Sequence, residues 1–135
     1  MQQSSTLPYV LVADDDALTL RSVSIILRGA GLRVVTVSDG GAALAQLRHE
    51  KPRIAVFDVM MGSLSGLDLC RLVKSDADLR DIHVILLTAR AMERERLEGL
   101  AAGADDYVSK PFSNRDLLGR VQRAWAAAPQ TPRPA

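Results

Sequence analysis

Short, nearly continuous apolar runs alternate with longer amphipathic segments along almost the whole chain, and this alternation strongly constrains the fold. Three runs, YVLVA, IAVF and HVILL, are apolar enough to predict strands covered on both faces, which is typical of parallel sheets. Two more polar runs, RVVTV and DYVS, are expected nearer the sheet edges. In chain order the five predicted strands are 9–13, 33–37, 54–57, 83–87 and 106–109.

Helical spacing of apolar residues marks the segments that follow these strands. The predicted helices are 17–30, 39–51, 66–75, 92–102 and 113–127. Asp39 opens the second, and Gly31 follows the first as a residue suited to the left-handed C-terminal cap. Five strands alternating with five helices predict one α/β domain, with a doubly wound parallel sheet and helices on both faces.

Polar side chains stand where several of the predicted strands end. Asp14 and Asp15 follow the first strand, Asp58 follows the third, Thr88 follows the fourth, and Lys110 follows the fifth. In open α/β sheets, ligands bind outside the carboxyl ends of the strands. If the first and third strands are neighbours, about 4.8 Å apart, the three carboxylates converge in one crevice.

Converging carboxylates predict a bound cation. Two unit charges at a separation of 4 Å repel by about 4 kcal/mol at an effective dielectric of 20. A set of hard oxygen ligands without His or Cys fits Mg²⁺, and Mn²⁺ is the alternative cation.

Each of these residues also has an ordinary structural explanation. Asp16 is interpreted as a helix N-cap, and for Asp14 and Asp15 the residues alone leave a cap or a functional role open. Asp58 alone is more typical of a turn residue, and Thr88 alone of a strand residue. The placement of all these residues at strand carboxyl ends favours the functional interpretation.

Composition excludes several other classes of protein. The chain has 135 residues and a formal net charge of +1, which predicts one domain and gives no electrostatic reason to expect nucleic acid or a membrane as a partner. Cys70 is the only cysteine, so neither an intramolecular disulfide nor a cysteine metal cluster is expected. There is no run of eighteen apolar residues and no signal peptide pattern in MQQSSTLP. A cytoplasmic protein is the resulting expectation.

Four segments in order, VLVADDDALTL, VFDVMM, LLTAR and YVSKPF, resemble the signature segments of the receiver domain of two-component response regulators. The resemblance runs from about residue 9 to residue 125. It implies a flavodoxin-like fold with strand order 2-1-3-4-5. The expected organisation is an N-terminal tail at 1–7, a receiver domain at 8–127, and a proline-rich tail or start of a linker at 128–135.

The resemblance implies a role for each acidic residue. Asp58 matches the aspartate that accepts a phosphoryl group from a sensor histidine kinase or a histidine phosphotransfer protein. Asp14 and Asp15 match the acidic pair that holds Mg²⁺, together with Asp58 and the backbone carbonyl of Met60.

The other matched positions concern the phosphoryl group and the switch. Lys110 matches the lysine that pairs with the phosphoryl charge, and the Lys110-Pro111 bond is cis in the family. Thr88 matches the hydroxyl that turns toward the phosphoryl group, and Ala89 leaves room beside it. Tyr107 matches the aromatic residue that moves from exposed to buried as Thr88 moves.

These roles together imply a phosphorylation-activated signalling switch, read out at the face formed by helix 4, strand 5 and helix 5. Such a protein catalyses its own phosphorylation and dephosphorylation, and it is not expected to act on external substrates unless an effector domain supplies that activity. The proline-spaced tail favours a linker to a C-terminal effector domain, with a stand-alone receiver as the alternative. A phosphorylation-dependent dimer is left open. This domain itself is not expected to bind nucleic acid or a membrane.

The loop after Asp58 departs from the family pattern. Receiver domains usually carry proline and then glycine after the positions of Met60 and Met61, and Asp before the glycine that opens the helix, whereas this chain has GSLSG at 62–66. The missing proline is expected to loosen this loop. Arg90 stands at a variable position near the site.

Three alternatives follow from the same residues. A magnesium-dependent aspartate phosphatase would need a second Asp where Met60 stands, and a nucleotide carrier would need a glycine-rich turn where DDDAL stands. A degenerate receiver, acting as a protein-interaction module without phosphorylation, is the more serious alternative. The presence of the matched acidic residues, Thr88 and Lys110 favours the switching receiver.

Overall fold

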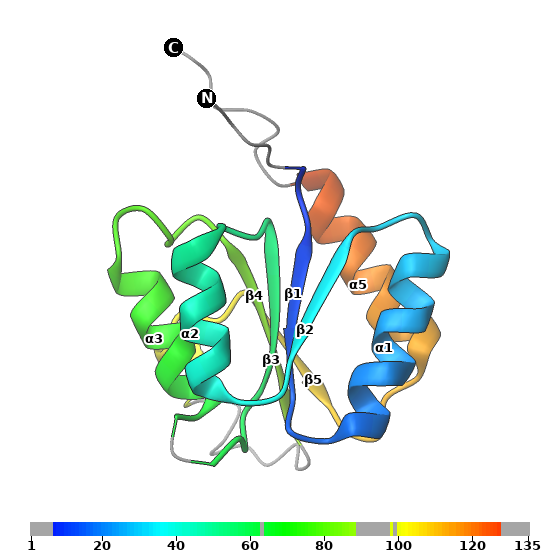
Figure 1. Cartoon of the computed structure of the whole chain (residues 1–135), viewed down its shortest axis with the longest axis horizontal. Coiled ribbons are helices and arrows are strands. Elements are labelled where there is room, and N and C mark those ends of the chain that lie inside the picture. Colours follow the sequence, from blue (N-terminus) through cyan, green and yellow to red (C-terminus); the bar gives the residue numbers. More distant parts are fainter. Residues whose placement is uncertain (1–6, 63, 89–97, 99, 128–135) are drawn as a thin grey trace.

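The computed structural model of the chain describes residues 7–62, 64–88, 98 and 100–127. Its centre is a five-stranded parallel sheet with the order β2-β1-β3-β4-β5 (Figure 1), which confirms the predicted fold class and strand order. The strands are β1 (Val10–Ala13), β2 (Val34–Val37), β3 (Ile54–Asp58), β4 (His83–Thr88) and β5 (Asp106–Ser109).

Helices cover both faces of this sheet. Four are described: α1 (Ala17–Gly29), α2 (Gly40–His49), α3 (Gly66–Ser75) and α5 (Asn114–Ala127). Helices α1 and α5 lie on one face, and α2 and α3 lie on the other (Figure 1). The helix expected at 92–102 lies mostly outside the described residues, so four of the five predicted helices are seen.

Single residues cap α1 at both ends and α2 at its start. Asp16 is the N-cap of α1, where its carboxylate accepts hydrogen bonds from the backbone N–H of Leu18 and the hydroxyl of Thr19. This confirms the cap interpretation of Asp16. Asp39 caps α2 by accepting from the backbone N–H of Ala42 at 2.7 Å. Gly31 follows α1 with a φ of 90°, a conformation that glycine adopts readily.

Two apolar layers, one on each face, hold the helices to the sheet. Alternate residues of β1 enter opposite layers: Leu11 packs beneath α2 and α3, and Val12 packs beneath α1 and α5. Cys70 of α3 is buried in the first layer, and burial raises the pKa of its thiol to about 11. The cysteine is therefore a neutral core residue.

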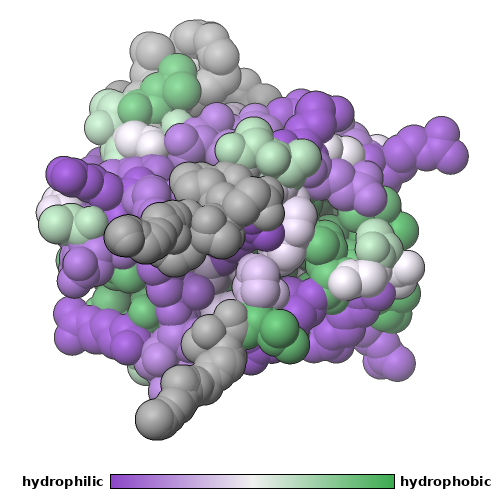
Figure 2. Space-filling model, turned by 90° about the horizontal axis from the view of Figure 1, so that it is seen from above, coloured by the Kyte–Doolittle hydropathy of each residue, from purple (hydrophilic) through white to green (hydrophobic). Residues whose placement is uncertain are grey.

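The end of the molecule at which β1 begins and α5 ends carries charged side chains. Figure 2 views the molecule from this end and shows hydrophilic residues over much of it. Arg33 and Glu50 form an ion pair of 2.8 Å, and the guanidinium of Arg53 stacks 4.6 Å from the ring centroid of Trp125. In the part of the chain that the structure describes, no helix has the length and apolar character needed to span a bilayer.

Candidate functional site

Two neighbouring central strands deliver three carboxylates to one place. Strands β1 and β3 pair in parallel, with Ala13 opposite Phe57. The next residues along each strand are therefore Asp14 and Asp58, with Asp15 following. Carboxylate oxygens of Asp14, Asp15 and Asp58 lie within 4.8 Å of one another. The structure brings together the three carboxylates that the sequence pattern placed at the strand ends.

The three carboxylates differ in their exposure to water. Asp14 is fully buried and Asp58 is 5% exposed, whereas Asp15 is exposed. An oxygen of Asp14 also accepts a hydrogen bond of 2.9 Å from the backbone N–H of Asp16. The site is therefore a crevice with two desolvated carboxylates at its base and one at its rim.

Lys110 brings a positive charge to this crevice from the end of β5. Its Nζ lies 2.9 Å from Oδ2 of Asp14 and 3.5 Å from Oδ1 of Asp58. The backbone N–H of Lys110 donates to the carbonyl of Thr88 at 2.6 Å, and the Lys110-Pro111 bond is cis. The ion pair with Asp14 was not predicted, because no sequence signal shows which carboxylate a lysine 96 positions away will contact.

The environment of Asp58 disfavours its charge. Burial and the negative charge of Asp14 raise the pKa of Asp58 to about 6, although Lys110 acts in the opposite direction. Burial acts to lower the pKa of Lys110, but the hydrogen bond with Asp14 and the charge of Asp58 raise it overall. In the folded protein, Asp58 therefore changes charge close to neutral pH while Lys110 stays an ammonium.

The donor atoms of the crevice fit a hard divalent cation. The three carboxylates offer oxygen ligands and no nitrogen or sulfur, which is the donor chemistry of Mg²⁺. The excess of negative charge beside Lys110 gives a cation an electrostatic reason to bind.

Thr88 and Tyr107 lie on the neighbouring strands β4 and β5. Thr88 is the last residue of β4 and is 2% exposed, and Tyr107 of β5 is half-buried against the layer beneath α2 and α3. Ala89, the predicted neighbour of the phosphoryl group, lies outside the described residues, as does Arg90.

The loop between β3 and α3 is held by backbone and capping bonds. The N–H of Gly66 donates to the carbonyl of Val59 at 3.1 Å. Ser65 and Asp68 form a capping box, in which each side chain accepts from the backbone N–H of the other at 3.1 Å. The Ser-x-x-Asp spacing is a sequence signal for this box. These bonds oppose the loosening that the missing proline is expected to cause.

Gly66 lies so close to the end of β3 that we expect Gly66→Ala to distort this strand. A Cβ at this position would stand 2.4 Å from the carbonyl oxygen of Asp58 and 2.9 Å from its carbonyl carbon. We expect a loss of about 2 kcal/mol in the free energy of unfolding, because these backbone atoms must move. Urea unfolding measures this change.

Gly29→Ala is the matched control, because a Cβ there meets nothing within 4 Å. It should raise the stability by about 0.5 kcal/mol, since alanine restricts the unfolded chain. Equal effects of the two substitutions would contradict the close approach at Gly66.

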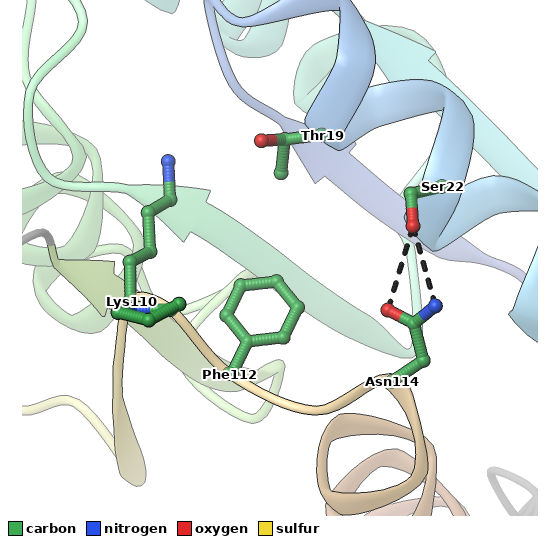
Figure 3. A pocket seen from close by; sticks show the side chains of 6 residues that line it. Thr19, Ser22, Lys110, Phe112 and Asn114 are labelled. Atoms are coloured by element: carbon green, nitrogen blue, oxygen red, sulfur yellow. Dashed lines mark hydrogen bonds between the residues drawn. The ribbon is translucent and has the colours of Figure 1, made fainter.

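An open groove of about 490 Å³ lies beside Lys110, between α1 and the segment that joins β5 to α5. Figure 3 shows the ring of Phe112 facing α1 between Lys110 and Asn114, and the hydrogen-bonded pair Ser22 and Asn114 on one side. The sequence pattern gave no indication of this groove, because its two walls come from opposite ends of the chain.

Known proteins share both this sequence pattern and this fold. The family model of the response regulator receiver domain matches residues 10–122. The DNA-binding response regulator MtrA of Mycobacterium tuberculosis is 35% identical over 113 residues, which are 84% of this chain and 48% of that protein. The heme response regulator HssR of Staphylococcus haemolyticus is 43% identical over 112 residues, which are 83% of this chain and 49% of that protein.

A solved structure gives the same result. The receiver domain of a signal transduction histidine kinase from Syntrophus aciditrophicus superposes with a TM-score of 0.86 at 30% identity, covering 96% of this chain and 98% of that one. The chain spans about half the length of the curated relatives it matches. The family model covers most of the chain, and the chain therefore belongs to the family of response regulator receiver domains, the signalling modules of two-component systems.

Proposed function

We propose that the protein is a phosphorylation-activated switch in which Asp58 accepts the phosphoryl group. The observation that carries this proposal is the convergence of Asp58, Asp14, Asp15 and Lys110 at the carboxyl end of the sheet. A buried carboxylate with a pKa of about 6 is ionised, and so nucleophilic, in neutral solution.

In the proposed reaction an oxygen of Asp58 attacks the phosphorus atom of a phosphohistidine. The new P–O bond forms as the P–N bond breaks, and the donor's imidazole nitrogen keeps the bonding electron pair. Lys110, already 3.5 Å from Asp58, interacts with the charge of the transferred group. Mg²⁺ held by the three carboxylates and the Met60 carbonyl would supply charge neutralisation during this transfer.

The signal is proposed to pass to the next two strands. The new phosphoryl oxygens attract the hydroxyl of Thr88, which ends β4 beside the site. Ala89 lies outside the described residues, and its role of leaving room for these oxygens is proposed from its small side chain alone. Tyr107 pairs in register with Leu86, two residues before Thr88, so a shift at the end of β4 changes its surroundings. The proposed readout face consists of β5, α5 and the helix expected at 92–102, which lies mostly outside the described residues. The receiver domain is proposed to catalyse its own phosphorylation and dephosphorylation, and any action on external substrates would belong to an effector domain.

The proposed donor is a sensor histidine kinase or a histidine phosphotransfer protein, with the groove beside Lys110 as its route of approach. We place this exchange in the cytoplasm, where a single thiol such as Cys70 stays reduced. The chain matches only about half the length of the DNA-binding regulator MtrA. This partial match supports an effector domain that is reached through a linker at 128–135. Contact with DNA would then belong to that effector, and phosphorylation-dependent dimerisation to the readout face.

The degenerate receiver is the second candidate, and the geometry disfavours it. An interaction module that is never phosphorylated has no need to bury Asp14 and Asp58 side by side, since such burial costs stability. A buried charge cluster without a structural benefit is typical of a functional site.

Beryllofluoride with Mg²⁺, which mimics a phosphoryl group, tests the switch by NMR. We expect chemical shift changes at the amides around Asp58 and Thr88, which lie at the modified site, and around Tyr107, to which β4 is proposed to pass the change. The Asp58→Asn protein should show none of them under the same conditions. A wild-type spectrum that does not change would contradict the switching function and favour the degenerate receiver.

A further inference from the structure

Gly40, the first residue of α2, lies against the loop that follows Asp58. It is buried directly after the cap residue Asp39. A Cβ at Gly40 would stand 2.2 Å from the carbonyl oxygen of Leu64 and 2.7 Å from its Cβ. Figure 1 places the start of α2 and the loop between β3 and α3 at the same end of the sheet. The absence of a side chain at Gly40 is therefore what permits this contact.

Leu64 stands near the end of the loop that leads from the acceptor to α3, directly before the cap residue Ser65. It follows Met60 by four residues and packs, half-buried, on the layer beneath α2 and α3. The bonds at Val59 and Ser65 fix the two ends of the loop. The contact with Gly40 adds a support from a separate helix, so the loop is held between α2 and its own capping box.

We infer that Gly40 is a positioning residue for the phosphoryl site, an assignment that rests on the proposed function. The bare backbone of Gly40 determines where Leu64 lies, and Leu64 in turn constrains the backbone at Met60. A side chain at residue 40 would displace the Leu64 carbonyl by roughly 1 Å, a distance large enough to impair a ligand or reacting group. Gly40 acts through the loop and touches no reacting atom.

The neighbouring glycine has a different environment and supplies a matched control. A Cβ at Gly41 would approach only Oδ1 of Asp39, at an ordinary contact distance of 3.4 Å. Both glycines lie in the first turn of α2, so alanine at either position changes helix propensity in the same way. A difference between Gly40→Ala and Gly41→Ala therefore reports the contact with Leu64.

Two measurements on the full chain test the inference. In metal-free protein, we expect Gly40→Ala to shift the NMR signals of the amides of 59–61, and Gly41→Ala to leave them in place. In calorimetric titrations with Mg²⁺, Gly40→Ala should weaken binding by about tenfold, the effect of disturbing residues that support metal ligands. Gly41→Ala should change the affinity by less than about twofold.

A second pair of variants keeps the test valid if Gly40→Ala does not fold. Leu64 and Leu79 are both partly buried leucines that pack on the same apolar layer, but Leu79 lies in the turn before β4. Leu64→Ala and Leu79→Ala should lower the melting temperature to a similar extent. Only Leu64→Ala should weaken Mg²⁺ binding, because only Leu64 belongs to the loop beside Asp58.

The outcomes separate this inference from the proposed function. Equal Mg²⁺ affinities for both members of each pair would overturn the role of Gly40, even if the wild-type protein is phosphorylated. A wild-type protein that accepts no phosphoryl group would instead contradict the proposed function. Selective loss of Mg²⁺ affinity in Gly40→Ala and Leu64→Ala supports the inference.

Discussion

The Asp58→Asn protein is expected to incorporate less than about one hundredth of the phosphoryl group that the wild-type protein takes from a small acyl phosphate. The amide of asparagine is a poor nucleophile and has no charge to balance that of Lys110. The three other charged groups of the site remain, so the loss isolates the contribution of the acceptor itself. Intact-protein mass spectrometry of the reaction over time measures the incorporation.

Asp16→Asn is the matched control for this loss. It removes a carboxylate close to the same strand end, but asparagine caps a helix as well as aspartate does. Its labelling rate should stay within about twofold of the wild type, since Asp16 faces solvent and caps α1. If Asp58→Asn is labelled as fast as the wild type, Asp58 is not the acceptor.

The same Asp58→Asn substitution is expected to stabilise the metal-free protein at neutral pH. Folding raises the pKa of Asp58 from 3.8 to about 6, so the folded state binds a proton more tightly than the unfolded state does. The free energy of unfolding of the wild type therefore falls as the pH rises from 3.8 to 6 and stays low above that. A pKa shift of this size lowers the free energy of unfolding of the wild type by about 3 kcal/mol above the raised pKa. The Asp58→Asn protein avoids this loss, because asparagine carries no charge.

Urea unfolding of both proteins in a chelating buffer, from about pH 4 to about pH 8, tests this linkage. The stability gain of Asp58→Asn should be near zero at the acidic end and should reach its full size above the raised pKa. Asp39→Asn, which replaces an exposed cap carboxylate, should show no comparable gain. A gain from Asp58→Asn that does not change with pH would mean that a cause other than charge burial produces it.

The fold was predictable because the pattern of apolar residues permits few arrangements of strands and helices. Runs such as IAVF have no polar face, so their strands must lie inside a covered sheet, and the helices between them must cross on its faces. The exact strand ends were less predictable: β3 includes Asp58 and β4 includes Thr88, each one residue beyond the predicted end. A polar side chain can continue the backbone pairing of a strand although it interrupts the apolar pattern.

The site was predictable as far as backbone register determines it. Once β1 pairs with β3, the carboxylates that follow them must meet. The ion pair of Lys110 with Asp14 and the contact of Gly40 with Leu64 were not predictable, because each joins distant segments through a choice of rotamer or a close approach of backbones. The capping box of Ser65 and Asp68 does have a local signal, the Ser-x-x-Asp spacing at the start of α3.

Helix α5 connects the two ends of the molecule. It begins beside the groove next to Lys110, and its 14 residues rise about 20 Å to the end where β1 starts. Anything joined after Ala127 would therefore begin far from the carboxylates and could not touch them at the point of attachment. Because α5 packs on the sheet through Leu117 and Val121, a change at the end of the sheet that holds Asp58 can reach that attachment point along the helix.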